Sequence, residues 1–544
     1  MSRSGSVLGI DLGTTYSCIA QVDRYGRPEV ISNMDGDATT PSVVHFQGDD
    51  AVVGKLAKRS SRIDPDHVAQ LVKRQMGDPD WRFQAGGRDW SAPGVSSLIL
   101  GSLARDAERA TGLPVKDVVI TVPAYFGNEE RKATKLAGEL AGLNVIDLIN
   151  EPTAAAYAYG FGLAAAAEGT GADETVLVYD LGGGTFDITI IELRGNDIRV
   201  VATDGDHELG GANWDAELAA LLSERFLMAV PSGSDPFDDV YSEADLMTQA
   251  EELKASLSQR ERADALVTSG TERASVTLTR EEFEIVTRPL LERTIELTRR
   301  ALASARELGS PRIDRCLLVG GSSKMPAVAR RLTEEFGFAP QLADPDLAVC
   351  KGAALYGHKK LLERLVSDAT AKGVDLRQAL ADAAGEHGMT SDAVKQVVDK
   401  RVVNVVSRGF GVLAKQDDVL TTVFLVHRND PVPIEVDEVF YTMVDDQTHV
   451  RVQVVEQGGA EESPDPADAT VLVRGEISDL PPGYPEGTEL RVRMSMGGDG
   501  ILTVTAHHAG RKQPLTMTVD TTSALSGEEL AAEAEAVSLL KKKL

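Results

Sequence analysis

The spacing of hydrophobic and polar positions divides the chain into segments with different periods. Apolar runs at 7–12 and 176–181 have the length of buried strands and end in glycine-rich turns. A second β-rich run follows each turn, at 16–22 and at 186–192. We therefore expect a strand–turn–strand hairpin at each of the two places.

The two hairpins share one design. Asp11 ends the first strand and precedes a turn at 13–15, and Asp180 likewise precedes a turn at 182–185. Such an internal duplication predicts related α/β lobes that face one another.

Helical and strand patterns fill the space between and after the hairpins. Helix-like runs at 95–110 and 128–141 enclose a buried-strand pattern at 117–122. A further strand-and-glycine element at 316–322 leads into a helix that begins at Pro326, a residue suited to a first helical turn. This first part of the chain alternates strands and helices, as α/β domains do.

The pattern changes twice later in the chain. Residues 358–401 keep a helical spacing, with Thr390 as a predicted cap of a short last helix. From 402 to 520, runs such as 449–454 alternate strictly, which is typical of half-buried antiparallel strands. A short helical pattern at 526–540 follows.

The composition of the chain excludes several classes of protein and of binding partner. Hydrophobic residues make up 42% of the 544 positions and charged residues 26%, the mix of a globular protein in water. The formal net charge of −28 disfavours nucleic acid as a main partner, because phosphate backbones attract clustered positive charge. We see neither a signal sequence nor the roughly 18 apolar residues of a membrane helix. The 3 cysteines are widely spaced, without a CxxC pair, so we expect no disulfide framework, no zinc site and a cytoplasmic location.

The glycine turns have a chemistry of their own. Glycine lets backbone N–H groups approach a phosphate closely, and threonine hydroxyls add donors. Aspartate would repel phosphate, so Asp11 and Asp180 are suited to hold hydrated Mg²⁺, a hard cation that prefers oxygen ligands. One such turn alone could be an ordinary capped hairpin, but the repetition favours a site for a magnesium nucleotide.

Six stretches taken in order resemble the seventy-kilodalton heat-shock chaperone family: 10–17, 119–126, 150–156, 180–187, 209–211 and 499–502. The resemblance covers nearly the whole chain except the connector and the C-terminal end. It implies an α/β actin-like ATPase with two duplicated lobes, followed by an antiparallel β-sandwich. The implied domains are the ATPase at 1–357, a helical connector at 358–401, a peptide-binding β domain at 402–520 and a short C-terminal helix at 521–544.

The resemblance also implies a site for ATP or ADP with Mg²⁺, and K⁺ is an additional candidate ion. The family's catalytic positions match Lys73, Glu151, Asp11 and Thr185, and its metal-binding carboxylates match Asp11 and Asp180. Phosphoryl transfer needs positioning and charge neutralisation, and Lys73 can supply positive charge at the γ-phosphate. Without the resemblance, Lys73 would be read as a surface lysine and Glu151 as a favourable charge at a helix N-terminus.

The other nucleotide contacts that the resemblance implies come from several segments. They are Gly13, Thr14, Thr15, Tyr16, Gly182, Gly183, Gly184, Glu251, Lys254, Ser258, Gly320, Gly321, Ser322, Lys324 and Asp346. Glu251, Lys254 and Ser258 share one helix face, although an exposed charged face would show the same spacing. Lys324 stands where the family usually has an arginine on the adenine. Because lysine lacks the planar guanidinium, we expect altered nucleotide affinity.

In the β domain, the family's peptide groove matches Phe410, Val412, Phe440, Val450 and Val452. Such a groove holds an extended apolar peptide by main-chain hydrogen bonds and a side-chain pocket. The same residues could instead form the sandwich core, since alternation does not tell which face is open. No apolar arch residue and no long helical lid are evident, so we expect fast peptide release.

Two positions depart from the family. Asp147 stands where members usually carry arginine, and Asn404 replaces the usual linker aspartate. In the family these positions contact J-domain co-chaperones, so an ordinary J-domain contact is not expected here. A partner with compensating charges, or a nucleotide exchange factor, stays open.

These features predict an ATP-dependent chaperone-like protein of the protein-folding and stress-response type, a slow ATP hydrolase whose β domain binds unfolded or extended polypeptide. One alternative is an ATP-binding scaffold or regulatory protein with negligible hydrolysis, which the changes at Asp147 and Asn404 motivate. Another is an actin-like kinase or filament protein, and the β domain argues against it.

Overall fold

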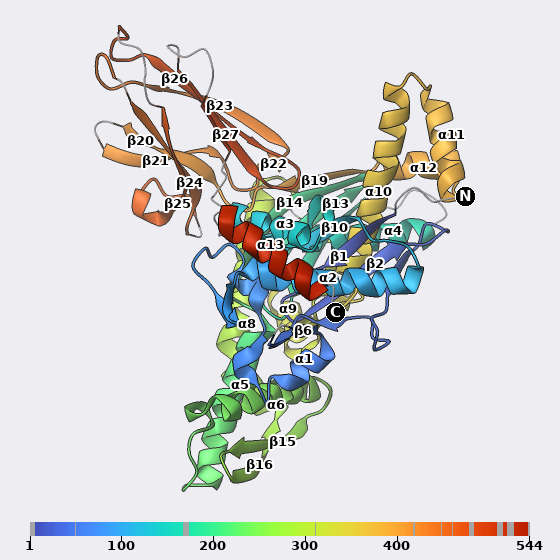
Figure 1. Cartoon of the computed structure of the whole chain (residues 1–544), viewed down its shortest axis with the longest axis vertical. Helices are drawn as coiled ribbons and strands as arrows, with labels where there is room; N and C mark the ends of the chain where they lie inside the picture. The colour runs from blue at the N-terminus through green and yellow to red at the C-terminus, as the bar shows by residue number, and fades with distance from the viewer. Residues whose placement is uncertain are drawn as a thin grey trace.

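The structure, a computed structural model, describes residues 6–48, 50–166, 173–310, 312–416, 419–447, 449–459, 461–477, 483–508, 515–518 and 527–541. They form an α/β body of two lobes, a helical hairpin, a β domain and a C-terminal helix that lies across the first lobe (Figure 1). The predicted domain boundary at 520/521 lies outside the described residues.

Lobe I contains the first glycine turn. Its strands are β1 (Val7–Asp11), β2 (Tyr16–Val22), β3 (Pro28–Ile31), β4 (Thr40–Pro41), β5 (Val44–Gln47), β6 (Asp50–Val53), β7 (Val68–Ala69), β8 (Phe83–Ala85), β9 (Arg88–Trp90), β10 (Asp117–Val122) and β11 (Asn144–Asn150). Its helices are α1 (Lys55–Ser60), α2 (Ala92–Thr111), α3 (Asn128–Leu140) and α4 (Glu151–Ala166), with 3-10 turns η1 (Pro65–His67) and η2 (Val72–Gln75). The main sheet has the order β11-β10-β1-β2-β3, and β1 and β2 form the predicted antiparallel hairpin. The predicted elements at 95–110, 117–122 and 128–141 are confirmed as α2, β10 and α3.

Lobe II contains the second glycine turn. Its strands are β12 (Glu174–Leu181), β13 (Phe186–Arg194), β14 (Asp197–Asp206), β15 (Arg262–Ser269), β16 (Glu272–Thr279), β17 (Arg315–Val319) and β18 (Pro340–Leu342). Its helices are α5 (Gly211–Ala229), α6 (Val240–Gln259), α7 (Arg280–Val286), α8 (Arg288–Glu307) and α9 (Pro326–Phe336), with 3-10 turns η3 (Pro236–Asp238) and η4 (Gly321–Lys324). The hairpin of β12 and β13 and the start of α9 at Pro326 are confirmed.

A long helix joins the lobes and continues into the helical hairpin. α10 spans Ala348–Ala371, and α11 (Leu376–His387) and α12 (Ser391–Val398) fold back along its second half (Figure 1). Position 358, the predicted start of the connector, therefore lies inside α10. The first half of α10 lies directly on β1 and α4, because an added Cβ at Gly9 would be 2.1 Å from the backbone of Ala354. Thr390 caps α12 as predicted, accepting a hydrogen bond of 3.2 Å from the N–H of Ala393.

The β domain packs two sheets face to face. Its strands are β20 (Phe410–Gln416), β21 (Val419–Val426), β23 (Ile434–Tyr441), β24 (Val450–Gln457), β25 (Ala469–Ile477), β26 (Glu489–Met496), β27 (Leu502–His508) and β28 (Leu515–Thr518), with a 3-10 turn η5 (Pro466–Asp468). The strand orders are β21-β20-β24-β25 and β23-β26-β27-β28, and both sheets contribute valine, leucine and methionine side chains to one core.

The β domain is docked on the lobes through a shared sheet. β19 (Arg401–Val405) runs parallel to β14 of lobe II, and β22 (Pro431–Val432) pairs antiparallel with β19. The lobe II sheet thus has the order β18-β17-β12-β13-β14-β19-β22. Beside it, the buried carboxylate of Asp204 binds Arg300 of α8 at 2.7 Å and Arg428 of the β domain at 3.1 Å. Main-chain pairing and this shared carboxylate fix the β domain against lobe II.

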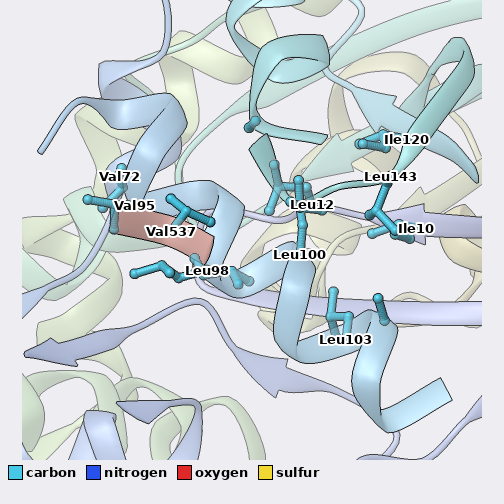
Figure 2. Close-up of a cluster of buried hydrophobic side chains, with 14 of the residues drawn as sticks. Ile10, Leu12, Val72, Val95, Leu98, Leu100, Leu103, Ile120, Leu143 and Val537 are labelled. Atoms are coloured by element: carbon cyan, nitrogen blue, oxygen red, sulfur yellow. The ribbon is translucent and has the colours of Figure 1, made fainter. Parts of the chain in front are cut away.

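The C-terminal helix α13 (Gly527–Lys541) belongs to the core of lobe I. Its apolar side chains Ala536, Val537 and Leu540 are buried in the same cluster as the residues of α2 and β1. Figure 2 shows Val537 beside Val95 and Leu98 of α2. Among the described helices, none combines the length and the apolarity that crossing a bilayer would require.

Candidate active site

A cleft of about 540 Å³ lies between the two lobes, and both glycine turns line it. It brings together nearly all the site residues that the sequence predicts: Asp11, Gly13, Thr14, Thr15, Tyr16, Lys73, Glu151, Asp180, Gly182, Gly183, Thr185, Glu251, Lys254, Ser258, Gly320, Gly321, Ser322, Lys324 and Asp346. Gly184 lies just behind this surface, packed on Thr14.

The two turns face each other in van der Waals contact. An added Cβ at Gly183 would lie 2.2 Å from the Thr15 hydroxyl, and one at Gly184 would lie 2.3 Å from the Thr14 methyl group. Only glycine allows this approach, so the two turns lie side by side along the cleft with Thr14, Thr15 and Thr185. Such a pair of turns is suited to a chain of phosphates.

Lys73 and Glu151 form a buried ion pair at the base of the cleft. Lys73 is in η2 and Glu151 opens α4, and their side chains are 4% and 10% exposed. The Lys73 ammonium donates a 2.5 Å hydrogen bond to the Glu151 carboxylate. Because both charges are removed from water, each one needs the other to offset its desolvation. The pair also fixes the direction in which the ammonium points.

Several carboxylates surround this one lysine. Burial and then the nearby Glu151 carboxylate raise the pKa of Asp11 to about 7, and the same causes raise the pKa of Asp187 to about 7. Burial, and after it the charge of Glu151, raises the pKa of Asp180 well above its usual range. Burial and the Glu151 charge thus both favour the protonated form of these three aspartates, and the positive charge of Lys73 opposes them.

This donor set fits a hydrated magnesium ion. Carboxylate oxygens are the ligands that Mg²⁺ prefers, and Asp11 and Asp180 end the strands on either side of the cleft. Across the described ranges, no three acidic, histidine or cysteine side chains converge closely enough to bind an ion by themselves. Mg²⁺ typically keeps several waters and uses substrate phosphates, so wider-spaced carboxylates suit it.

The far end of the cleft is built from ion pairs. Lys58 of lobe I bonds Glu251 of lobe II at 2.6 Å, and Lys254 bonds Asp215 at 2.7 Å. Lys324 is paired with Asp346, and both residues line the cleft. The predicted adenosine contacts are thus held in place by partners, and the Lys58–Glu251 pair also ties the two lobes together.

Sequence reasoning missed three side chains of the site. Thr121 donates a 3.0 Å hydrogen bond to Asp11, and Asp187 accepts one of 3.0 Å from the N–H of Tyr125. Arg74 of lobe I donates to the carbonyl of Gly184 at 3.0 Å and so braces the second turn. Thr121 and Asp187 lie within quoted stretches and Arg74 follows Lys73, so these positions in the sequence were the available signal.

The two departures from the family pattern have partners inside the chain. Asp147 accepts a 2.9 Å hydrogen bond from the Tyr356 hydroxyl and pairs with Lys360 at 2.7 Å, both from α10. Asn404, on β19, accepts a 2.9 Å hydrogen bond from the Thr153 hydroxyl.

The residues predicted for a peptide groove lie mostly inside the sandwich. Phe410, Val412 and Val452 are buried in its core, and Phe440 and Val450 are partly buried against it. Exposed apolar side chains occur instead at the start of β21, at the end of β23 and in the loop after it: Val419, Leu420, Tyr441, Met443 and Val444.

Fold and site together define a two-lobed α/β protein with an interlobe phosphate-binding cleft and an attached β domain. The family model described as Hsp70 protein matches residues 7–85 and 77–542. The chain therefore belongs to the Hsp70 family, whose members are in general chaperone ATPases that bind adenine nucleotides with Mg²⁺ and bind unfolded polypeptide.

Proposed function

We propose that this chain is an ATP-dependent chaperone that hydrolyses ATP slowly in the interlobe cleft and couples the nucleotide state to peptide binding by its β domain. The observation that carries the coupling is the strand β19. It is an added strand of the lobe II sheet and at the same time pairs with β22 of the β domain. A movement of lobe II that breaks this pairing releases the β domain.

In the cleft, the two facing turns orient the phosphates through backbone N–H groups and the hydroxyls of Thr14, Thr15 and Thr185. Lys73, held by Glu151, places a positive charge toward the γ-phosphate, where negative charge develops during transfer. Asp11 and Asp180 would hold a Mg²⁺ ion, which would neutralise further charge on the phosphates. In this proposal the carboxylate of Glu151 also orients the attacking water.

In the β domain, extended peptide is bound near the exposed apolar side chains of the strand ends and the loops. Phe440 and Val450, which are partly buried, connect this surface to the sandwich core. Peptide bound there alters the packing of the sheet that docks on lobe II, which gives the two sites a shared element.

The experiment is release of a fluorescent apolar peptide measured with and without ATP. Coupling predicts faster release with ATP in the wild-type chain and no ATP effect in Lys73→Ala if hydrolysis is required. Equal rates with and without ATP in the wild type would contradict the coupling. Single-turnover hydrolysis measured beside it identifies the alternative, an ATP-binding scaffold, by an undetectable rate.

A further inference from the structure

Helix α3 of lobe I has a cap that comes from the β domain. Its N-cap residue is Gly127, which has no side chain to accept a hydrogen bond. The carboxylate of Glu456, on β24, lies at this helix start instead, where the backbone N–H of Asn128 favours its charged form. An added Cβ at Gly127 would lie 2.5 Å from Oε1 of Glu456, so the glycine makes room for this approach.

Helix α2 is joined in the same way by the C-terminal helix. Glu533 of α13 accepts hydrogen bonds of 2.8 Å from the backbone N–H and from the hydroxyl of Ser91, the N-cap of α2. An added Cβ at Gly94 would lie 1.9 Å from Oε1 of Glu533. Both C-terminal elements therefore dock on lobe I by placing a glutamate at the start of a helix, beside a glycine.

Glu456 is buried among charges of both signs. Its side chain is 5% exposed, and Arg408 lies 3.5 Å away while Glu129 and Glu130 of α3 face it with like charge. Arg131 of α3 also faces it at longer range. Within the described residues, Oε1 of Glu456 is buried and accepts no hydrogen bond. A buried carboxylate oxygen without a donor is the place for a proton.

Glu533 is buried in a similar setting. Its neighbours with charge are Arg82, which favours the carboxylate, and Glu529 of α13, which disfavours it. Burial is the largest influence and raises the pKa of Glu533, while the two bonds from Ser91 oppose it. Both carboxyl groups would return to water if the β domain and α13 left lobe I.

We propose that docking of the β domain and α13 on lobe I is proton-linked through Glu456 and Glu533, so that acidification favours the docked arrangement. Burial raises the pKa of Glu456 from 4.5 to about 7 in the docked chain. Between pH 4.5 and about 7 Glu456 is therefore protonated in the docked state and ionised in the undocked state. The docking equilibrium constant falls as the pH rises toward 7 and is constant above it. For Glu456 alone, linkage gives a fall of about 25-fold in the docking equilibrium constant between pH 5.5 and 8.

The test measures docking directly by energy transfer between dyes on lobe I and the β domain. The exposed sites Glu139→Cys in α3 and Glu438→Cys in β23 accept the dyes, because the native cysteines are buried. Docking is followed from pH 5.5 to 8 in the wild type, in Glu456→Gln, in the double variant with Glu533→Gln, and in the control Glu489→Gln. The glutamines keep the shape and the hydrogen-bond acceptor but cannot titrate.

The wild type and the Glu489→Gln control are expected to lose transfer as the pH rises, Glu456→Gln to lose less, and the double variant to stay docked with a flat profile. The same pH profile in the double variant as in the wild type would overturn the proposal. A wild type whose docking strengthens as the pH rises, or does not depend on pH, would also overturn it. This inference rests on the proposed function only for its biological use. Proton-linked docking in a chain that hydrolyses no ATP would support this inference and contradict the proposed function. ATP-driven peptide release with pH-independent docking would contradict this inference and support the proposed function.

Discussion

The packing of α13 on lobe I allows a prediction of how much one substitution weakens the docking of this helix. Val537 is completely buried and packs between side chains of α2, whereas Leu539, two positions on, is 52% exposed (Figure 2). Val537→Ala removes two buried methyl groups, worth about 1.6 kcal/mol at about 0.8 kcal/mol per carbon. With the cavity left behind, the docking free energy falls by about 2–3 kcal/mol.

That loss has a direct readout in the opening of α13. At about 1.4 kcal/mol per factor of ten, the open population of the helix rises by about 30- to 150-fold. Amide hydrogen exchange of residues 527–541, measured at one pH, reports this opening. Leu539→Ala is the matched control, and its exchange is expected to change by no more than about twofold, since exposed substitutions cost about 0.5 kcal/mol or less.

Equal protection of the helix in the two variants would refute the reasoning. It would mean that α13 does not rest on lobe I through Val537, whatever the rest of the chain does. Protection lost across all of lobe I in Val537→Ala would instead show that the helix is required for the fold of the lobe rather than docked on it.

Three further changes test the cleft and the domain contact. Lys73→Ala is expected to lower single-turnover hydrolysis by about 10²–10³-fold while calorimetry still detects nucleotide binding, because one transition-state charge is removed. Thr121→Val deletes a hydrogen bond that favours the carboxylate of Asp11, so the pKa of Asp11 rises further and the acid limb of the pH–rate profile moves to higher pH; an unmoved limb would show that Asp11 does not control the rate. Arg428→Ala removes one of the charged partners of Asp204 and is expected to weaken docking by about 1.5–3 kcal/mol, seen as lost energy transfer between lobe I and the β domain, with lobe II still folded.

Much of the fold follows from local patterns in the sequence. The hairpin turns, the helix at 128–140 and the cap at Thr390 depend on neighbours within a few positions, and the structure has them where the spacing predicts them. The cleft residues are more widely separated. Their convergence was expected only because the duplicated turns and the family resemblance supplied the long-range geometry.

The contacts between domains could not be read from the sequence. By its polar, glycine- and proline-bearing composition the stretch 456–468 predicts a loop, yet Glu456 and Gln457 are buried at the end of β24. Glu456 faces Gly127 of lobe I, and Gln457 accepts a hydrogen bond from the N–H of Gly409, so both are buried against residues far away in the sequence. The packing of α13 on lobe I could not be predicted for the same reason. The sequence of an alanine- and glutamate-rich helix does not show which surface covers its narrow apolar stripe.

The two departures from the family pattern point to one design for the linker. The negative charge of Asp147 is balanced by Lys360, which lies on the part of α10 that runs into the helical hairpin. Asn404 is 8% exposed within β19, where a carboxylate would lose its hydration, and the neutral amide needs only the hydroxyl of Thr153 as its donor. Charge is thus matched within the chain at Asp147 and absent at Asn404, and the neutral side chain of Asn404 lowers the cost of burying β19 in the lobe II sheet. A partner that acts on this linker must therefore compete with contacts that the chain already makes for itself.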